Sequence, residues 1–182
     1  MTKPIADHRL FLSHWMDLRG VDALLPTAEA FLDNPNPLFA PNILVLDVYD
    51  DDLIIRLQAT ELVERWGADL TGHSMFDARL PMNKPDMLKN VERLMKQPCG
   101  LLSVHKTETS GGRKLIIETL GLPLSTPTRK SSRMVNYSWL IDPLEDGEHS
   151  EKVTVYERQE WIDIGAGIPS EKPLKPMTPS NT

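Results

Sequence analysis

The sequence predicts an α+β fold in which a five-stranded antiparallel sheet carries helices on one face, with an amphipathic helix added at the N-terminus. Apolar residues recur at helical spacing near the N-terminus and again over residues 83–97. Two short β-branched runs precede the second of these helices, and three longer strand candidates follow it. Strands and helices are therefore grouped along the chain, which favours one antiparallel sheet over a parallel one.

The N-terminal helix is predicted over residues 6–19. Its large apolar side chains, Phe11, Trp15 and Leu18, stand among charged residues at the spacing of an amphipathic helix. Burying each of them contributes about 2 kcal/mol, which is enough to hold a helix that is marginal alone. We expect this helix to cover the second face of the sheet, in the same chain or in a second copy, and to support a homodimer.

A connector and a hairpin follow. Residues 21–42 contain four prolines and one short predicted helix at 27–32. Residues 43–49 and 53–58 are apolar and rich in β-branched side chains, so they predict two paired strands. The three aspartates at 50–52 raise the alternative of a metal site, but an ion-binding loop spaces its oxygen ligands around the ion. A hairpin turn is the favoured interpretation.

The middle of the chain predicts a short helix at 60–66, a glycine-bounded segment at 67–72, and a longer helix at 83–97. The longer helix has one apolar stripe and one charged side, and Pro98 and Gly100 end it. Gly67 is expected to cap the short helix in a left-handed conformation, with Leu70 turned inward.

The remaining strands are predicted at 101–107, 113–122 and 134–141. Glycines at 111 and 112 supply the turn between the first two. An extended piece at 153–161 either adds to the sheet or packs across it.

These elements divide the chain into four parts. We expect an N-terminal helix and connector at 1–39, a core at 40–142, an extension packing on or beside the core at 143–168, and a disordered, proline-rich tail at 169–182.

This order of elements, together with the segment Gly67-Ala68-Asp69-Leu70-Thr71-Gly72, resembles the PAS sensor domain. In that family, two strands lead into short helices and a signature of the type Gly-x-x-Leu-Thr-Gly. A connecting helix and three long strands follow. The segments HRLFLSHWMDLRG, LVLDV and IDIGAGIPS look like those of short bacterial single-PAS proteins that carry no output domain. The resemblance implies a sensing or regulatory role without catalysis.

Composition excludes several classes of partner. A formal charge of -6 and a pI near 5.4 argue against a nucleic-acid or membrane-surface partner, because phosphate contact needs concentrated Lys and Arg. A single cysteine suits a reducing cytosol, and no apolar run approaches the ~20 residues of a membrane helix. A cytoplasmic location is expected.

No cofactor, metal site or catalytic residue is predicted. A haem-binding PAS domain would place an axial histidine on the connecting helix, and residues 83–97 contain none. His73 and His105 are the remaining candidates, for which a surface or structural role is favoured. A flavin photoreceptor of this fold needs a cysteine after the signature, where residues 74–77 have none. Cys99 is expected to be a buried, unreactive side chain.

Two functional hypotheses follow. In the first, the chain is a non-catalytic PAS-type regulatory protein that acts in trans by docking an unidentified signalling protein. In the second, it is a sensor that binds a small molecule between the helix at 83–97 and the sheet. The expected cavity lining, which is also the expected core, is Trp66, Met75, Phe76, Met87, Val91, Leu94, Val104, Ile117, Tyr137 and Trp139.

Overall fold

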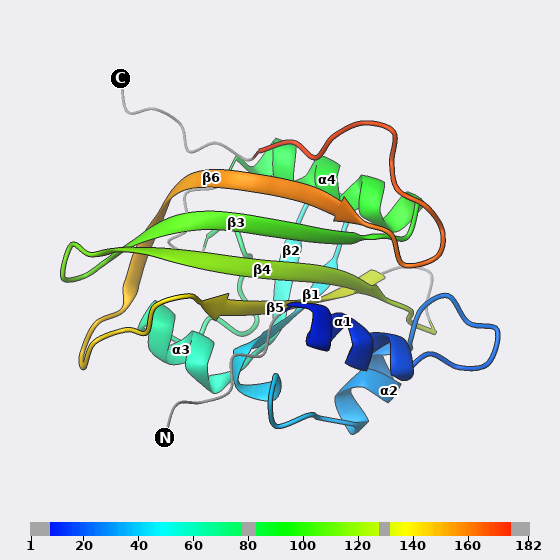
Figure 1. Ribbon diagram of the computed structural model, residues 1–182, viewed down its shortest axis with the longest axis horizontal. Coiled ribbons are helices and arrows are strands. Elements are labelled where there is room, and N and C mark those ends of the chain that lie inside the picture. The colour runs from blue at the N-terminus through cyan, green and yellow to red at the C-terminus, as the bar shows by residue number, and fades with distance from the viewer. Residues whose placement is uncertain (1–7, 78–82, 128–131, 176–182) are drawn as a thin grey trace.

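Six strands form one antiparallel sheet in this computed structural model, which describes residues 8–77, 83–127 and 132–175 (Figure 1). The strand order is β2-β1-β5-β4-β3-β6. The helices are α1 (His8–Asp17), α2 (Ala28–Asp33), η1 (Ala40–Asn42), α3 (Thr60–Trp66) and α4 (Lys84–Lys96). The strands are β1 (Ile43–Val48), β2 (Leu53–Gln58), β3 (Gly100–Thr109), β4 (Lys114–Leu124), β5 (Ser132–Leu140) and β6 (Ser150–Ile162).

The order of elements from β1 to β5 is the PAS-like order expected from the sequence. The expected number of strands was too low, because β6 pairs with β3 along its whole length, from Gly100 opposite Ile162 to Thr109 opposite Ser150. β6 pairs with the outward backbone groups of the ten-residue strand β3, which would otherwise form an edge of the sheet. The extension is therefore part of the sheet.

Helices cover both faces of the sheet. In Figure 1, α1 and α2 lie in front of it and α4 lies behind it. The side chains of β1 divide accordingly: Ile43 and Val45 pack in the cluster that includes α1 and α2, whereas Leu44 and Leu46 pack in the cluster that includes α3 and α4. This alternation follows from the two-residue period of a strand. The prediction that the N-terminal helix covers the second face is confirmed.

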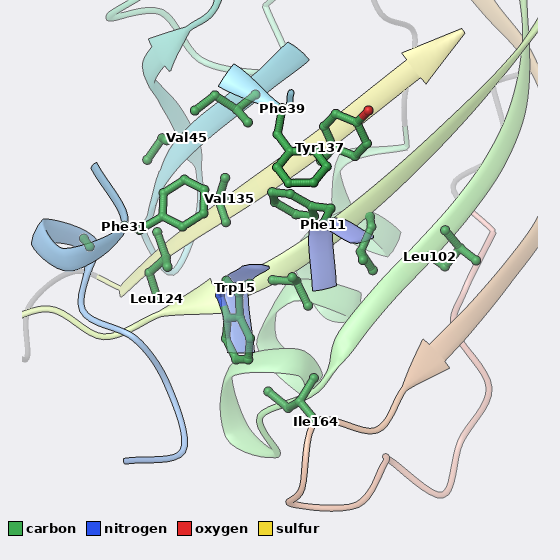
Figure 2. Packing of buried hydrophobic residues seen from close by; sticks show 14 of the residues in the cluster. Phe11, Trp15, Phe31, Phe39, Val45, Leu102, Leu124, Val135, Tyr137 and Ile164 are labelled. Atoms are coloured by element: carbon green, nitrogen blue, oxygen red, sulfur yellow. The ribbon is translucent and has the colours of Figure 1, made fainter. Parts of the chain in front are cut away.

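The helix α1 is held by aromatic packing within its own chain (Figure 2). Phe11 and Trp15 have no exposed surface, and the ring of Phe11 stacks on that of Tyr137 at 5.0 Å between centroids. The indole N–H of Trp15 donates to the carbonyl oxygen of Pro123 at 3.2 Å. Leu18 is partly buried against the same cluster.

This packing decides between two expected arrangements of the helix. Phe11, Trp15 and Leu18 were expected to cover the sheet from the same chain or from a second copy and to support a homodimer, and the first two are enclosed by their own sheet while the third lies against it. They contribute to folding, since a side chain without exposed surface offers nothing to a second molecule. The homodimer stays a prediction.

The glycine-bounded segment that carries the PAS resemblance is a turn locked onto β2. Gly67 ends α3 with φ of 71°, and its N–H donates to the carbonyl of Glu64, so the predicted left-handed cap is confirmed. The side chain of Gln58 donates to the carbonyl of Ala68 at 3.1 Å and accepts from the N–H of Leu70 at 2.8 Å. One buried amide thus fixes both sides of the turn.

The same segment then runs along the outer edge of β2. The N–H of Gly72 donates to the carbonyl of Ile55 at 2.7 Å, and the N–H of Ile55 donates to the carbonyl of His73 at 3.0 Å. The N–H of Met75 donates to the carbonyl of Leu53 at 2.7 Å. The segment therefore occupies backbone groups that an edge strand would otherwise expose.

The C-terminal stretch is more ordered than expected. Asn90 of α4 is completely buried, and its side-chain amide pairs with the backbone of Leu174 through bonds of 2.6 and 2.8 Å. Glu171 forms an ion pair with Arg93, and its carbonyl accepts from the indole N–H of Trp161. The predicted disordered tail at 169–182 is therefore wrong up to residue 175, because these polar contacts hold it on α4. Residues 176–182 lie outside the described part.

Candidate functional site

A cavity of about 100 Å³ lies between the sheet and the helices α3 and α4. It is on the side of the sheet where a ligand site was expected. Its volume is small compared with the ~300 to 1,000 Å³ of sites for drug-sized ligands. The lining residues are Leu44, Leu46, Leu53, Leu62, Arg65, Trp66, Met75, Met87, Val91, Leu101, Ser103, His105, Ile117, Thr119, Gly121, Met134, Asn136 and Ser138.

Half of the expected lining residues face this cavity. Trp66 and Met75 approach it from α3 and the following turn, Met87 and Val91 from α4, and Ile117 from β4. These residues were predicted from the helical stripe and from the position of the turn. They form an apolar side of the cavity.

Tyr137 and Trp139 were placed on the wrong face. Both pack in the cluster formed with α1 and α2, where Tyr137 stacks on Trp139 at 5.1 Å. The neighbouring residues Asn136 and Ser138 face the cavity instead. The strand has a two-residue period, and its aromatic side is the one that needed the cover of α1.

The other three expected residues do not line the cavity either. Val104 occupies an alternate position between the lining residues Ser103 and His105. Phe76 is partly buried beside the apolar cluster on the cavity side. Leu94 packs instead in a separate cluster with Cys99, Leu101 and Trp161.

The polar side of the cavity was missed by the sequence analysis. It consists of Arg65 from α3 and of five residues from the long strands: Ser103, His105, Thr119, Asn136 and Ser138. Their signal in the sequence is clear only on β5, where Asn136 and Ser138 alternate with Val135, Tyr137 and Trp139. Such a pattern usually indicates a solvent-exposed face, and here α3 and α4 enclose it.

Arg65 is the only charged side chain among the described residues that line the cavity, and it is 3% exposed. Its guanidinium donates to Asn42 Oδ1 at 2.8 Å, to the Ser138 hydroxyl at 3.1 Å and to the Ser138 carbonyl at 3.3 Å. Within the described ranges, its Nε has no hydrogen-bond partner and the side chain forms no ion pair. Burial lowers the pKa of Arg65 to about 10, so the side chain remains a cation at neutral pH.

His105 is neutral at physiological pH. Burial, and secondly the positive charge of Arg65, lower the pKa of His105 to about 4. The neutral imidazole therefore has one donor and one acceptor nitrogen and adds no second positive charge to the cavity. The other candidate histidine, His73, is exposed at the sheet edge and does not line the cavity.

Hydroxyl groups tie the polar side together. Thr119 Oγ1 donates to Ser138 Oγ at 3.0 Å, and the amide of Gln159 donates to Ser103 Oγ at 3.0 Å. Gly121 makes room for this arrangement: a Cβ at that position would lie 2.6 Å from Asn136 Oδ1 and 2.8 Å from Met134 Cε. The missing side chain lets two residues of β5 extend over β4.

Cys99 is fully buried and free. Burial, and to a smaller degree the charge of Asp163, raise the pKa of its thiol to about 11. The thiol is protonated at neutral pH and therefore a poor nucleophile, consistent with the inert role expected for it.

Comparison with known proteins gives a partial similarity to a solved structure. No family model and no curated protein matches the chain. Among solved structures, a PAS domain of an HTR-like protein from Haloarcula marismortui is similar, with a TM-score of 0.41 and 14% identity. The match covers 57% of this chain and 86% of that one. In the described part of the chain, no helix has the length and apolar character needed to cross a bilayer.

Proposed function

We propose that this protein is a non-catalytic sensor that binds a small molecule in the cavity between α4 and the sheet. The observation that carries the proposal is the composition of that cavity: one apolar side, one polar side and, among its described lining residues, a single buried cation. Convergent polar groups in an otherwise apolar enclosure are typical of ligand sites, whereas a cavity that serves packing alone is lined by apolar side chains. The volume favours a ligand much smaller than a haem or a flavin.

Arg65 supplies a route by which occupancy of the cavity could reach the surface. Besides the cavity, it lines a wider groove on the outer side of α3, together with the exposed side chains of Leu38 and Ile141. A ligand that repositions this side chain changes its bonds to Ser138, which lines the cavity, and to Asn42, which lines the groove. Docking of a signalling protein in trans, the first hypothesis from the sequence, fits into the proposal as the output step.

The test is binding of small molecules to the purified protein and to two variants of α4. Saturation-transfer NMR with a mixture of neutral and charged compounds, each of roughly two to eight non-hydrogen atoms because the cavity is smaller than sites for drug-sized ligands, should detect ligands of the wild type. Val91→Phe fills the cavity and should abolish the signals. Met95→Phe adds the same ring one turn later, at a residue that does not line the cavity, and should preserve them.

Native mass spectrometry of the protein as purified complements this test, because a retained ligand adds mass that Val91→Phe should remove. If no compound binds the wild type and none is retained, the sensor proposal is wrong. A role in protein docking alone would then be favoured.

A further inference from the structure

The buried cation of the cavity forms no ion pair with any described residue. Arg65 donates to neutral oxygen atoms, those of Asn42 and Ser138. Glu61, one turn earlier on α3, acts on it through space and raises its pKa, but stays beyond ion-pair distance of the guanidinium. Buried charges in proteins are nearly always paired, since removal from water is costly for an ion alone. An anion in the cavity would give this cation the charged partner that the described residues do not supply.

The residues that line the cavity also favour one sign of charge on the ligand. None of its described lining residues is acidic, and its polar groups are hydroxyls, an amide and a neutral imidazole, each of which can donate a hydrogen bond. A cationic ligand would meet Arg65 at close range with no compensating carboxylate from that lining. An anionic ligand would meet one cation and several donors.

The volume and the apolar lining of the cavity narrow the class of ligand further. The cavity of about 100 Å³ is well below the ~300 to 1,000 Å³ of sites for drug-sized ligands, so it suits a ligand of few non-hydrogen atoms. The apolar side, formed in part by Leu62, Met87 and Val91, would leave an inorganic oxyanion poorly solvated. A short aliphatic acid satisfies both sides of the cavity. The Nε–H of Arg65, which has no hydrogen-bond partner among the described residues, can donate to a carboxylate oxygen.

We propose that the cavity binds a short-chain monocarboxylate, with the carboxylate against Arg65 and the polar side chains of the three long strands, and the alkyl group against α3 and α4. This assignment rests on the proposed sensor function and specifies its ligand class. His105 lies in the field of Arg65, so a bound carboxylate partly cancels that field and raises the pKa of His105 above its value in the empty protein.

The experiment compares sodium propionate with propionamide, which has the same shape and no charge, at constant ionic strength set with sodium chloride. Binding is followed by amide chemical shifts in two-dimensional NMR spectra. We expect propionate to bind at least tenfold more tightly than propionamide, with the largest shifts at residues that line the cavity.

Variants in α3 and α4 test whether propionate binds in the cavity. Val91→Phe should remove the propionate shifts, and Met95→Phe should retain them. Arg65→Lys keeps the charge and loses the Nε–H donor, so propionate affinity should fall several-fold while selectivity over propionamide persists. Arg65→Met should remove the selectivity. If this variant does not fold, the comparison of the two ligands on the wild type still decides the question.

The outcomes separate the two proposals. Equal binding of propionate and propionamide overturns the carboxylate assignment and leaves the sensor function intact. Selective propionate binding that survives Val91→Phe places the anion outside the cavity and also overturns the assignment. If propionate does not bind but neutral compounds bind in a way that Val91→Phe blocks, the ligand class is wrong and the site is right.

Discussion

Replacing Trp15 by alanine tests whether α1 belongs to the folded core of its own chain. Trp15 has no exposed surface, packs in the large aromatic cluster and donates to the Pro123 carbonyl. Truncating a buried aromatic side chain costs about 3 to 5 kcal/mol. For a chain of this size, each kcal/mol lowers the melting temperature by about 2 to 4 °C, so a decrease of roughly 6 to 20 °C is expected for Trp15→Ala.

Two further variants separate the contributions to this loss of stability. Trp15→Phe keeps most of the packing and leaves the Pro123 carbonyl without its donor, which should cost about 1 to 3 kcal/mol. Leu10→Ala lies on the same helix at a side chain that is 52% exposed, and should change the free energy of unfolding by no more than about 0.5 kcal/mol. The first variant reports on the hydrogen bond and the second is the control for helix propensity.

The assay is urea denaturation followed by far-ultraviolet circular dichroism, because loss of a tryptophan alters fluorescence directly. Each variant is measured at a low and a much higher protein concentration. Packing of α1 within one chain predicts that the cost of Trp15→Ala is the same at both. If Trp15→Ala unfolds at the same urea concentration as Leu10→Ala, or if its cost appears only at the higher protein concentration, the assignment of α1 to its own sheet is refuted.

Three other predictions concern pH, a turn and the C-terminal contact. The pKa of His105 is about 4 in the folded chain and 6.5 for an unperturbed histidine, so the unfolded chain binds a proton first as the pH falls. The folded state therefore loses stability between about pH 6.5 and 4. This loss of stability amounts to about 3 kcal/mol. In His105→Gln, the difference between the unfolding free energies at about pH 7 and about pH 4.5 should be smaller by this amount. Equal pH dependence in the wild type and in His105→Gln would contradict the lowered pKa. Gly67→Ala should cost about 1 kcal/mol in thermal unfolding from its φ of 71° alone, since the new Cβ would meet the His149 ring at an ordinary 3.5 Å; an unchanged melting temperature would show that the left-handed cap is not required. Asn90→Ala should speed hydrogen exchange of the Leu174 amide by about tenfold or more, because that amide donates to the Asn90 side chain, and unaltered exchange would mean that other contacts hold the C-terminal stretch.

The sequence predicted the order of elements because each element carries a local signal. The apolar stripe of α4, the glycine cap at Gly67 and the β-branched runs of the hairpin are properties of adjacent residues, and all three appear in the structure. The sixth strand was left open because period and composition do not show which edge a strand joins. That choice depends on β3 having a long free edge, which is a property of the assembled sheet.

The candidate site was predictable only in part for a similar reason. Strand periodicity separated Tyr137 and Trp139 from Asn136 and Ser138 correctly, but could not say which set faces the cavity. The helix that decides this, α1, lies far earlier in the chain. Arg65 carried no signal at all, since an arginine in the last turn of a short helix is ordinarily a solvent-exposed residue that favours the helix dipole.

The turn that follows α3 also restricts how this protein can assemble. An open strand edge is a template for intermolecular pairing, through which proteins aggregate or recruit extended peptides. At β2 this template is already occupied, because Gly72, His73 and Met75 use the outward backbone groups of Leu53 and Ile55. A partner that binds by strand addition must therefore approach the sheet at β6, and the β2 side is protected against growth into larger β-structures.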